Sequence, residues 1–311
     1  MSAGLDLAPD DGQQAIHDAL TRFCTEQLAE DEGFTRARWR ELAELGVLAL
    51  ATPEGDGGAA ELVLALDALG SAAFPGPLAA TFLAGAVLPP SERTALCAGE
   101  VLVSVGAPPL MPWAPQADLF LAVDGTQLWR ALPTGDVEAV DTLGGEPWGR
   151  VALARSEALN PGPRAFALHD LALAAQLAAH GDALLDAATE HARTRVQFGR
   201  TLGEFQAVAH PLANARMRLD GARTLARAAA CAWDDDADPA RTRTWASAAR
   251  ASARGAALEA AHVGHQTFGA LGITLEGPAF RLSRRIRQLA SQPPGEADSG
   301  GRDALLASVG W

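Results

Sequence analysis

The segment His191–Gln206 reads HARTRVQFGRTLGEFQ, and it joins two long stretches of helical character. Arg193, Arg195, Phe198 and Gly199 stand where the first stretch ends. In the second stretch, apolar residues recur three and four positions apart, which is the pattern of one buried face of a long helix. They are Phe205, Val208, Leu212, Ala215, Leu219, Ala222 and Ala226. The segment therefore predicts a connection between two helices of a bundle.

The ends of these helices carry recognisable signals. Thr201 and Glu204 have the spacing of a capping box at the start of the second helix. Pro211 is expected to kink that helix or to move its start, because proline lacks a backbone donor and clashes one turn back. Asp238-Pro239 reads as the N-cap and first residue of the next helix, and Gly269 as its end. The abundance of alanine predicts close approach of the helices.

The rest of the chain indicates a mainly α protein with a small β unit. We expect an N-terminal helical domain at residues 1–98, a small β domain at 99–158, a C-terminal four-helix bundle at 159–290 and a flexible tail at 291–311. The strands are predicted in the short apolar runs VLVSVGA, LFLAV, QLWRAL and RVALA, which Pro, Gly and Asp separate. The tail is rich in Pro, Gly and Ser, a composition typical of disorder.

Composition excludes several functions. The 311 residues have a formal net charge of −13, which argues against attraction to nucleic acid or to anionic membranes. The chain contains no lysine and no tyrosine, so a Schiff-base lysine, a P-loop lysine and a tyrosine acid or base are all excluded. Any anionic ligand must therefore be held by arginines.

The cysteines and the chain ends point to a soluble cytoplasmic protein. Cys24, Cys97 and Cys231 are odd in number and far apart, so we expect buried thiols rather than disulfides, and no metal site. The N-terminus is acidic where a signal peptide is basic, and no run of about 18 apolar residues could cross a bilayer.

A second stretch, His265–Arg287, reads HQTFGALGITLEGPAFRLSRRIR. Here a long helix ends near Gln266, and Gly269 and Gly272 let backbone amides approach a ligand before an arginine-rich helix begins. An amide, exposed backbone donors and a guanidinium suit a pyrophosphate. Taken singly, the glycines could be plain C-caps, and Arg193, Arg195 and Arg200 could form a solvated helix end.

Together the two stretches resemble carboxyl-domain motifs of the acyl-CoA dehydrogenase family of flavoenzymes. LAELGVLALATPEGDGG and FPGPLAATFLAGAVL resemble its N-terminal helical domain, so the resemblance covers most of the chain. It implies FAD bound at subunit contacts, with Arg195 at the FAD pyrophosphate, Phe198 at the adenine side, Gln206 at the nucleotide, and Gln266 through Ala270 around the phosphates. Phe198 could instead be core, and Gln206 an exposed helix residue.

The family reaction requires a carboxylate base beside the acyl-CoA thioester. At the first of the two family positions this chain has Pro293, and Glu296 lies nearby in the tail. At the second position it has His169 followed by Asp170. A histidine can act as a base, whereas Asp170 points about 100° around the helix.

The region from Val101 to Leu153 also departs from the family, because it has no clear counterpart of the strands that embrace the flavin ring. These departures suggest the base-less subunit of a two-subunit acyl-CoA dehydrogenase of the sterol side-chain type. Such a chain would complete the FAD site of a longer partner in a hetero-oligomer, as in a heterotetramer. Two alternatives are a self-sufficient dehydrogenase that uses His169 or Asp170, and a flavin-free structural subunit.

Overall fold

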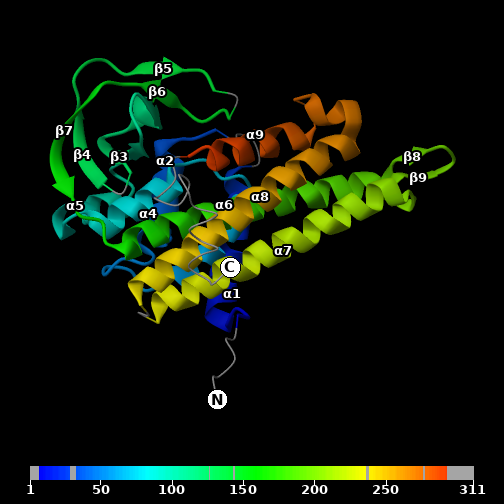
Figure 1. Cartoon of the computed structure of the whole chain (residues 1–311), viewed down its shortest axis with the longest axis horizontal. Coiled ribbons are helices and arrows are strands. Elements are labelled where there is room, and N and C mark those ends of the chain that lie inside the picture. Colours follow the sequence, from blue (N-terminus) through cyan, green and yellow to red (C-terminus); the bar gives the residue numbers. More distant parts are fainter. Residues whose placement is uncertain are drawn as a thin grey trace.

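The computed structural model describes residues 7–28, 33–125, 127–142, 144–235, 238–275 and 277–292, and its helices and strands follow one another as shown in Figure 1. The helices that precede the strands are α1 (Asp11–Gln27), α2 (Arg36–Glu44), α3 (Ala59–Ser71), α4 (Leu78–Val87) and α5 (Pro90–Cys97), with a 3₁₀ turn at Val47–Ala49. The long helices that follow them are α6 (Pro163–Thr194), α7 (Gln206–Asp234) and α8 (Pro239–Phe268), then the shorter α9 (Pro278–Ala290).

The strands between these helices form two small sheets. One has the order β1-β3-β4-β7, with β1 (Val103–Gly106) parallel to β3 (Leu119–Asp124) and the pairings to β4 (Gln127–Pro133) and β7 (Leu153–Leu159) antiparallel. The other has the order β2-β6-β5, from Leu110–Pro112, Trp148–Arg150 and Glu138–Val140. The mainly α fold with a small β unit is therefore confirmed.

One strand prediction is wrong in detail. The run RVALA was expected to be a single strand, but β6 ends at Arg150 and β7 begins at Leu153, in different sheets. Val151 lies between them and donates its backbone N–H to Pro109 O. Apolar content alone could not show that the chain changes sheets within this run.

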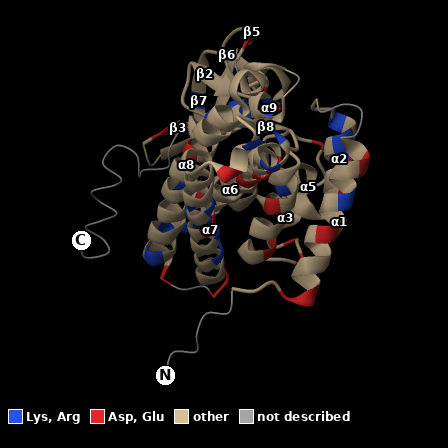
Figure 2. Cartoon of the chain, turned by 90° about the vertical axis from the view of Figure 1, so that its right-hand side faces the viewer, with Lys and Arg blue, Asp and Glu red and all other residues tan. Residues whose placement is uncertain are grey.

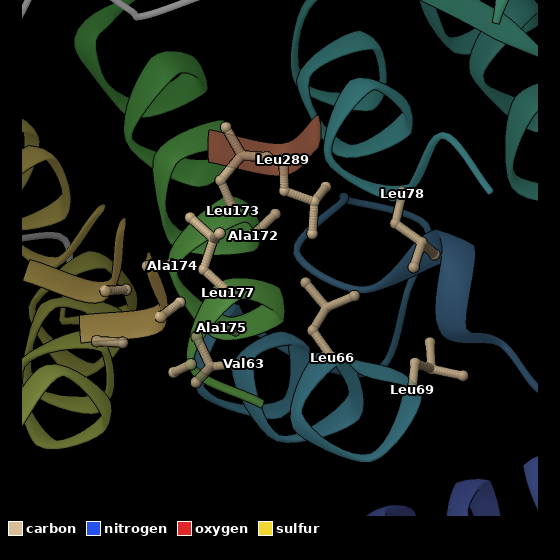
Figure 3. Packing of buried hydrophobic residues seen from close by; sticks show 14 of the residues in the cluster. Val63, Leu66, Leu69, Leu78, Ala172, Leu173, Ala174, Ala175, Leu177 and Leu289 are labelled. Atoms are coloured by element: carbon tan, nitrogen blue, oxygen red, sulfur yellow. The ribbon is translucent and has the colours of Figure 1, made fainter. Parts of the chain in front are cut away.

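Helix α6 is the centre of the hydrophobic core. It packs against α3, α4, α7, α8 and α9. Figure 3 shows Leu66 of α3 and Leu78 of α4 on the same side of α6, which contributes Leu173 and Leu177. Because α6 meets neighbours all round, residues 165–182 are all buried. The first and last helical regions thus share one core, and the domain boundaries stay a prediction.

The alanine-rich helices approach closely, as expected. A Cβ built at Gly181 of α6 would lie 2.7 Å from the Leu219 side chain of α7 and 3.3 Å from Ala257 Cα of α8. A larger residue at position 181 would therefore push these three helices apart. Small residues such as Ala215, Ala222 and Ala226 of α7 are buried in the same bundle.

The helix-end predictions have mixed outcomes. Asp238 accepts a hydrogen bond from Ala240 N and caps α8, and Gly269 ends it with φ of 61°, so both are confirmed. The capping box is wrong: Thr201 Oγ1 donates to Glu204 Oε1, and a 3₁₀ turn separates the pair from α7. Helix α7 begins at Gln206, so Pro211 lies inside the helix.

The cysteines are all free, but only Cys24 is fully buried, while Cys97 and Cys231 are half-buried. Burial raises the pKa of the Cys24 thiol to about 12. None of the helices in the described ranges has both the length and the apolar character to span a bilayer. Of the predicted tail, residues 293–311 lie outside the described part of the chain.

Candidate functional site

The segment His191–Gln206 contains an exposed hairpin at the end of the bundle. Helix α6 ends at Thr194, and Arg195 donates its backbone N–H to His191 O. The short strands β8 (Val196–Gln197) and β9 (Arg200–Thr201) then pair across a turn in which Phe198 has φ of 54° and Gly199 has φ of 80°. Phe198 is 92% exposed, so the alternative that it belongs to the core is wrong.

The second motif lies at the same end of the molecule. After α8 the chain makes a 3₁₀ turn at Gly269–Ile273, with Gln266, Gly269 and Ala270 exposed. The ring of His191 lies 4.9 Å from the ring of Phe268, so the ends of α6 and α8 are in contact. Figure 2 looks onto this end, with β8 towards the viewer.

The polar residues predicted to bind FAD are exposed in the structure. The Arg195 guanidinium and the side-chain amides of Gln206 and Gln266 are exposed, and a Cβ built at Gly269 would have open space around it. Guanidinium and backbone N–H groups are the usual partners of phosphate oxygens. All six candidate cofactor residues, Arg195, Phe198, Gln206, Gln266, Gly269 and Ala270, are therefore accessible to a ligand from outside the chain.

The two predicted cofactor segments also carry exposed apolar side chains. Val196 in the hairpin is 55% exposed, and Ile273 and Leu275 after the 3₁₀ turn are 74% and 83% exposed. Phe198 adds the largest exposed ring, 6.3 Å from the ring of Phe205. Clustered apolar surface rimmed by polar groups is typical of an interface with another chain.

The second predicted base position is buried and tied to α8. Asp170 is 1% exposed, and it accepts hydrogen bonds from Arg243, from Arg250 Nη1 at 3.0 Å and from Ser247 Oγ at 3.0 Å. Burial opposes the charge of this carboxylate, but His169 and the two guanidinium groups outweigh it and hold the pKa of Asp170 below its ordinary range. A general base needs a pKa near the working pH, and Asp170 is far from that condition.

His169 is also buried, at 5% exposed, and its Nδ1 lies 3.8 Å from Asp170 Oδ1. Burial, together with the nearby Arg250 and Arg243, lowers the pKa of His169 below its ordinary value despite Asp170. Pro293 and Glu296, at the first base position, lie outside the described residues. The last described residue, Gln292, accepts a hydrogen bond from Arg250 Nη2 at 2.8 Å.

Neither His169 nor Asp170 lines any of three cavities found among the described residues. One, of about 660 Å³, lies between the strands and α9. The second, of about 410 Å³, lies between α1 and α3, and the third, of about 700 Å³, lies between α6 and α7 below the β8–β9 hairpin. The first of these was not predicted from the sequence, because its lining comes from short segments far apart along the chain.

Two regions of the chain match models of one protein family. Residues 10–96 match the model of the acyl-CoA dehydrogenase N-terminal domain, and residues 164–291 match the acyl-CoA dehydrogenase C-terminal domain. The acyl-CoA dehydrogenase IpdE2 of Mycobacterium tuberculosis is 32% identical over 286 residues, which cover 86% of each chain.

Solved structures share the fold. A steroid ACAD structure described as the Tcur3481-Tcur3483 G363A variant superposes with a TM-score of 0.80 at 23% identity, covering 96% of this chain and 98% of that chain. The ChsE4-ChsE5 complex from Mycobacterium tuberculosis superposes with a TM-score of 0.78 at 23% identity, covering 98% of each chain.

Proposed function

The chain belongs to the acyl-CoA dehydrogenase family, whose cofactor is FAD, and we propose that it is the non-base-bearing subunit of a two-subunit enzyme. In this proposal its exposed hairpin end completes the FAD site of a longer cytoplasmic partner, and the partner supplies the catalytic glutamate. The reaction is the α,β-desaturation of an acyl-CoA thioester. A steroid side-chain thioester is the proposed substrate class, because a structural neighbour is a steroid ACAD.

The exposure of the hairpin end carries this proposal. Arg195, Phe198 and Gln266 are exposed, so the described part of this chain does not enclose them. A dinucleotide held only by this end would remain open to water on its other side. Apolar residues beside the donors, including Ile273 and Leu275, require a second chain to cover them. A partner subunit would both enclose the dinucleotide and cover the exposed apolar residues.

The second base position also supports a reading in which the partner subunit supplies the catalytic base. Asp170 is committed to Arg243, Arg250 and Ser247, so it has little capacity to accept a proton from a substrate. His169 is buried behind the same cluster. The arrangement therefore fits a chain in which this position stabilises the bundle, and it gives no support to the self-sufficient dehydrogenase.

FAD, when bound, would accept the hydride that leaves the β carbon of the substrate. The residues of this chain would bind and orient it. Arg195 would neutralise the diphosphate, and Gln266 with the backbone N–H groups after Gly269 would donate hydrogen bonds to its oxygens. Phe198, at the tip of the hairpin, would cover the adenine and keep water from it.

The test measures the flavin absorbance and native mass of this chain alone, and then after co-expression with a longer acyl-CoA dehydrogenase encoded beside it. We expect a colourless chain alone and a yellow mixed assembly that oxidises an acyl-CoA. A yellow, active homo-oligomer would refute the proposal and favour His169 or Asp170 as the base. A mixed assembly that stays colourless would instead identify a flavin-free structural subunit.

A further inference from the structure

The tip of the β8–β9 hairpin, which Figure 1 shows at one end of the molecule, combines two unfavourable features in one residue, Phe198. The pairing of Gln197 with Arg200 leaves Phe198 and Gly199 as a two-residue turn, in which φ is 54° and 80°. Asparagine followed by glycine is the usual sequence of such a turn, and a bulky residue at positive φ is an outlier. Phe198 is also 92% exposed. A strained and exposed phenylalanine points to a function for its ring.

The Phe198 ring rests against a stack of two further side chains. It lies edge-on to the ring of Phe205, with 6.3 Å between the ring centroids and 83° between the planes, a favoured geometry for aromatic pairs. The guanidinium of Arg200 lies over the same Phe205 ring, with Cζ 4.0 Å from its centroid, which is within the range of a cation–π contact. Phe205 therefore joins the residue at the tip of the turn to the strand that follows it.

Phe205 is a rigid base for this stack, because its backbone is hydrogen-bonded on both sides. Its N–H donates to Leu202 O at 3.1 Å. Its carbonyl oxygen accepts from the N–H groups of Val208 and Ala209 in the first turn of α7, both at 2.9 Å. The ring against which Phe198 rests is therefore fixed to the start of a long helix.

We propose that Arg200 and Phe205 are positioning residues, which hold Phe198 in the conformation in which it contacts the partner subunit. This role rests on the proposed function, in which the hairpin end meets that partner. A side chain that is already ordered loses less conformational entropy on binding, so the stack strengthens assembly. Arg200 acts through the Phe205 ring, and its role requires no contact with the cofactor.

The hairpin of the full chain, purified alone, tests the stack without a partner. Leu202 N–H donates to Arg195 O at the base of the hairpin, so its hydrogen exchange, followed by NMR and corrected for the intrinsic rate, reports the opening equilibrium. An exposed cation–π contact shifts an equilibrium about two- to fivefold, and Arg200→Gln should lower the protection of Leu202 by that factor. Arg200→Lys keeps the cation and should restore most of the protection. Arg193→Gln is the matched control, because the Arg193 side chain is 73% exposed in the same segment, and it should have no effect.

Co-expression with the longer acyl-CoA dehydrogenase encoded beside this chain tests the partner contact. The dissociation constant of the mixed assembly is measured by native mass over a dilution series. Arg200→Gln should raise this constant about two- to fivefold, and Phe205→Leu, which removes both contacts of the stack, should raise it by at least as much. The double variant should assemble no more weakly than Phe205→Leu, because Arg200 then has no ring to act through. Arg200→Lys should restore most of the affinity.

Circular dichroism and Tm establish that the variants are folded. If Arg200→Gln weakens assembly equally in the presence and absence of the Phe205 ring, the positioning role is overturned, since Arg200 would then contact the partner or the cofactor directly. Unchanged protection of Leu202 in Arg200→Gln would also overturn it. A wild-type chain that forms no mixed assembly would refute the proposed function, whereas a normal assembly that neither single variant weakens would refute the positioning role alone.

Discussion

Asp170→Asn should destabilise the chain by about 3–5 kcal/mol, the usual effect of removing one partner of a buried ion pair. Asp170 is 1% exposed and is the common acceptor of Arg243, Arg250 and Ser247. The amide keeps the shape but leaves two guanidinium groups without their counter-charge. For a chain of this length, about 2 cal/mol/K per residue of unfolding entropy converts this loss into a fall in Tm of roughly 5–8 °C.

Calorimetry and urea unfolding of the purified chain measure this loss, and Asp186→Asn is the control. Asp186 pairs with Arg216, but its side chain is 70% exposed, so at most about 1 kcal/mol is expected. The pKa of Asp170 is lowered in the folded state. Its contribution is therefore present above its ordinary pKa of 3.8 and is lost as the pH falls below that value. Equal losses in the two variants at neutral pH would refute the reasoning.

Four other outcomes are expected. Arg195→Ala should lower the flavin content of the assembled complex while circular dichroism stays unchanged; unaltered flavin content would contradict its phosphate role. Phe198→Ser should leave Tm within about 1 °C, because this ring is 92% exposed, yet weaken assembly with the partner by native mass. Burial lowers the pKa of His180 to about 4, so the unfolded chain takes up a proton at a higher pH than the folded chain. The free energy of unfolding of wild type should therefore fall by about 3 kcal/mol between pH 6.5 and 4. Urea unfolding of His180→Gln at the same pH values should lack this loss. Asp234→Ala should cost about 1–2 kcal/mol, because Asp234 accepts from the N–H of Ala59 at the start of α3; an unchanged urea midpoint would count against this cap.

Local signals gave reliable predictions for the helices. Apolar spacing marked the buried face of α7, and Asp238 and Gly269 marked the ends of α8, because such features depend on neighbours within a few residues. The capping box at Thr201 and Glu204 failed because the hairpin geometry inserts a 3₁₀ turn before α7 begins. The exposed state of Phe198 could not be read from composition, since phenylalanine is usually buried.

Long-range contacts were beyond prediction from a single sequence. Arg243 and Arg250 lie 73 and 80 residues from Asp170 along the chain. Their spacing of seven residues, which places both on one face of α8 among alanines, was the available signal that they face a common partner. The cavity between the strands and α9 is lined by loops from the first two parts of the chain and by helix α9 of the third, and no periodicity connects them. Cavities of this kind depend on how the elements assemble.

The central place of α6 has a consequence for biosynthesis. The apolar faces of α3 and α4 are complete once about a third of the chain has been synthesised, but their partner helix begins at Pro163 and continues to Thr194. Until the ribosome has released that segment, Leu62, Leu66 and neighbouring side chains can pack against α1 but lack the α6 surface of the core. We therefore expect the nascent chain to need chaperone protection until Thr194, more than six-tenths of the way along the 311 residues, has been translated, and to collapse into its final form as α6 emerges.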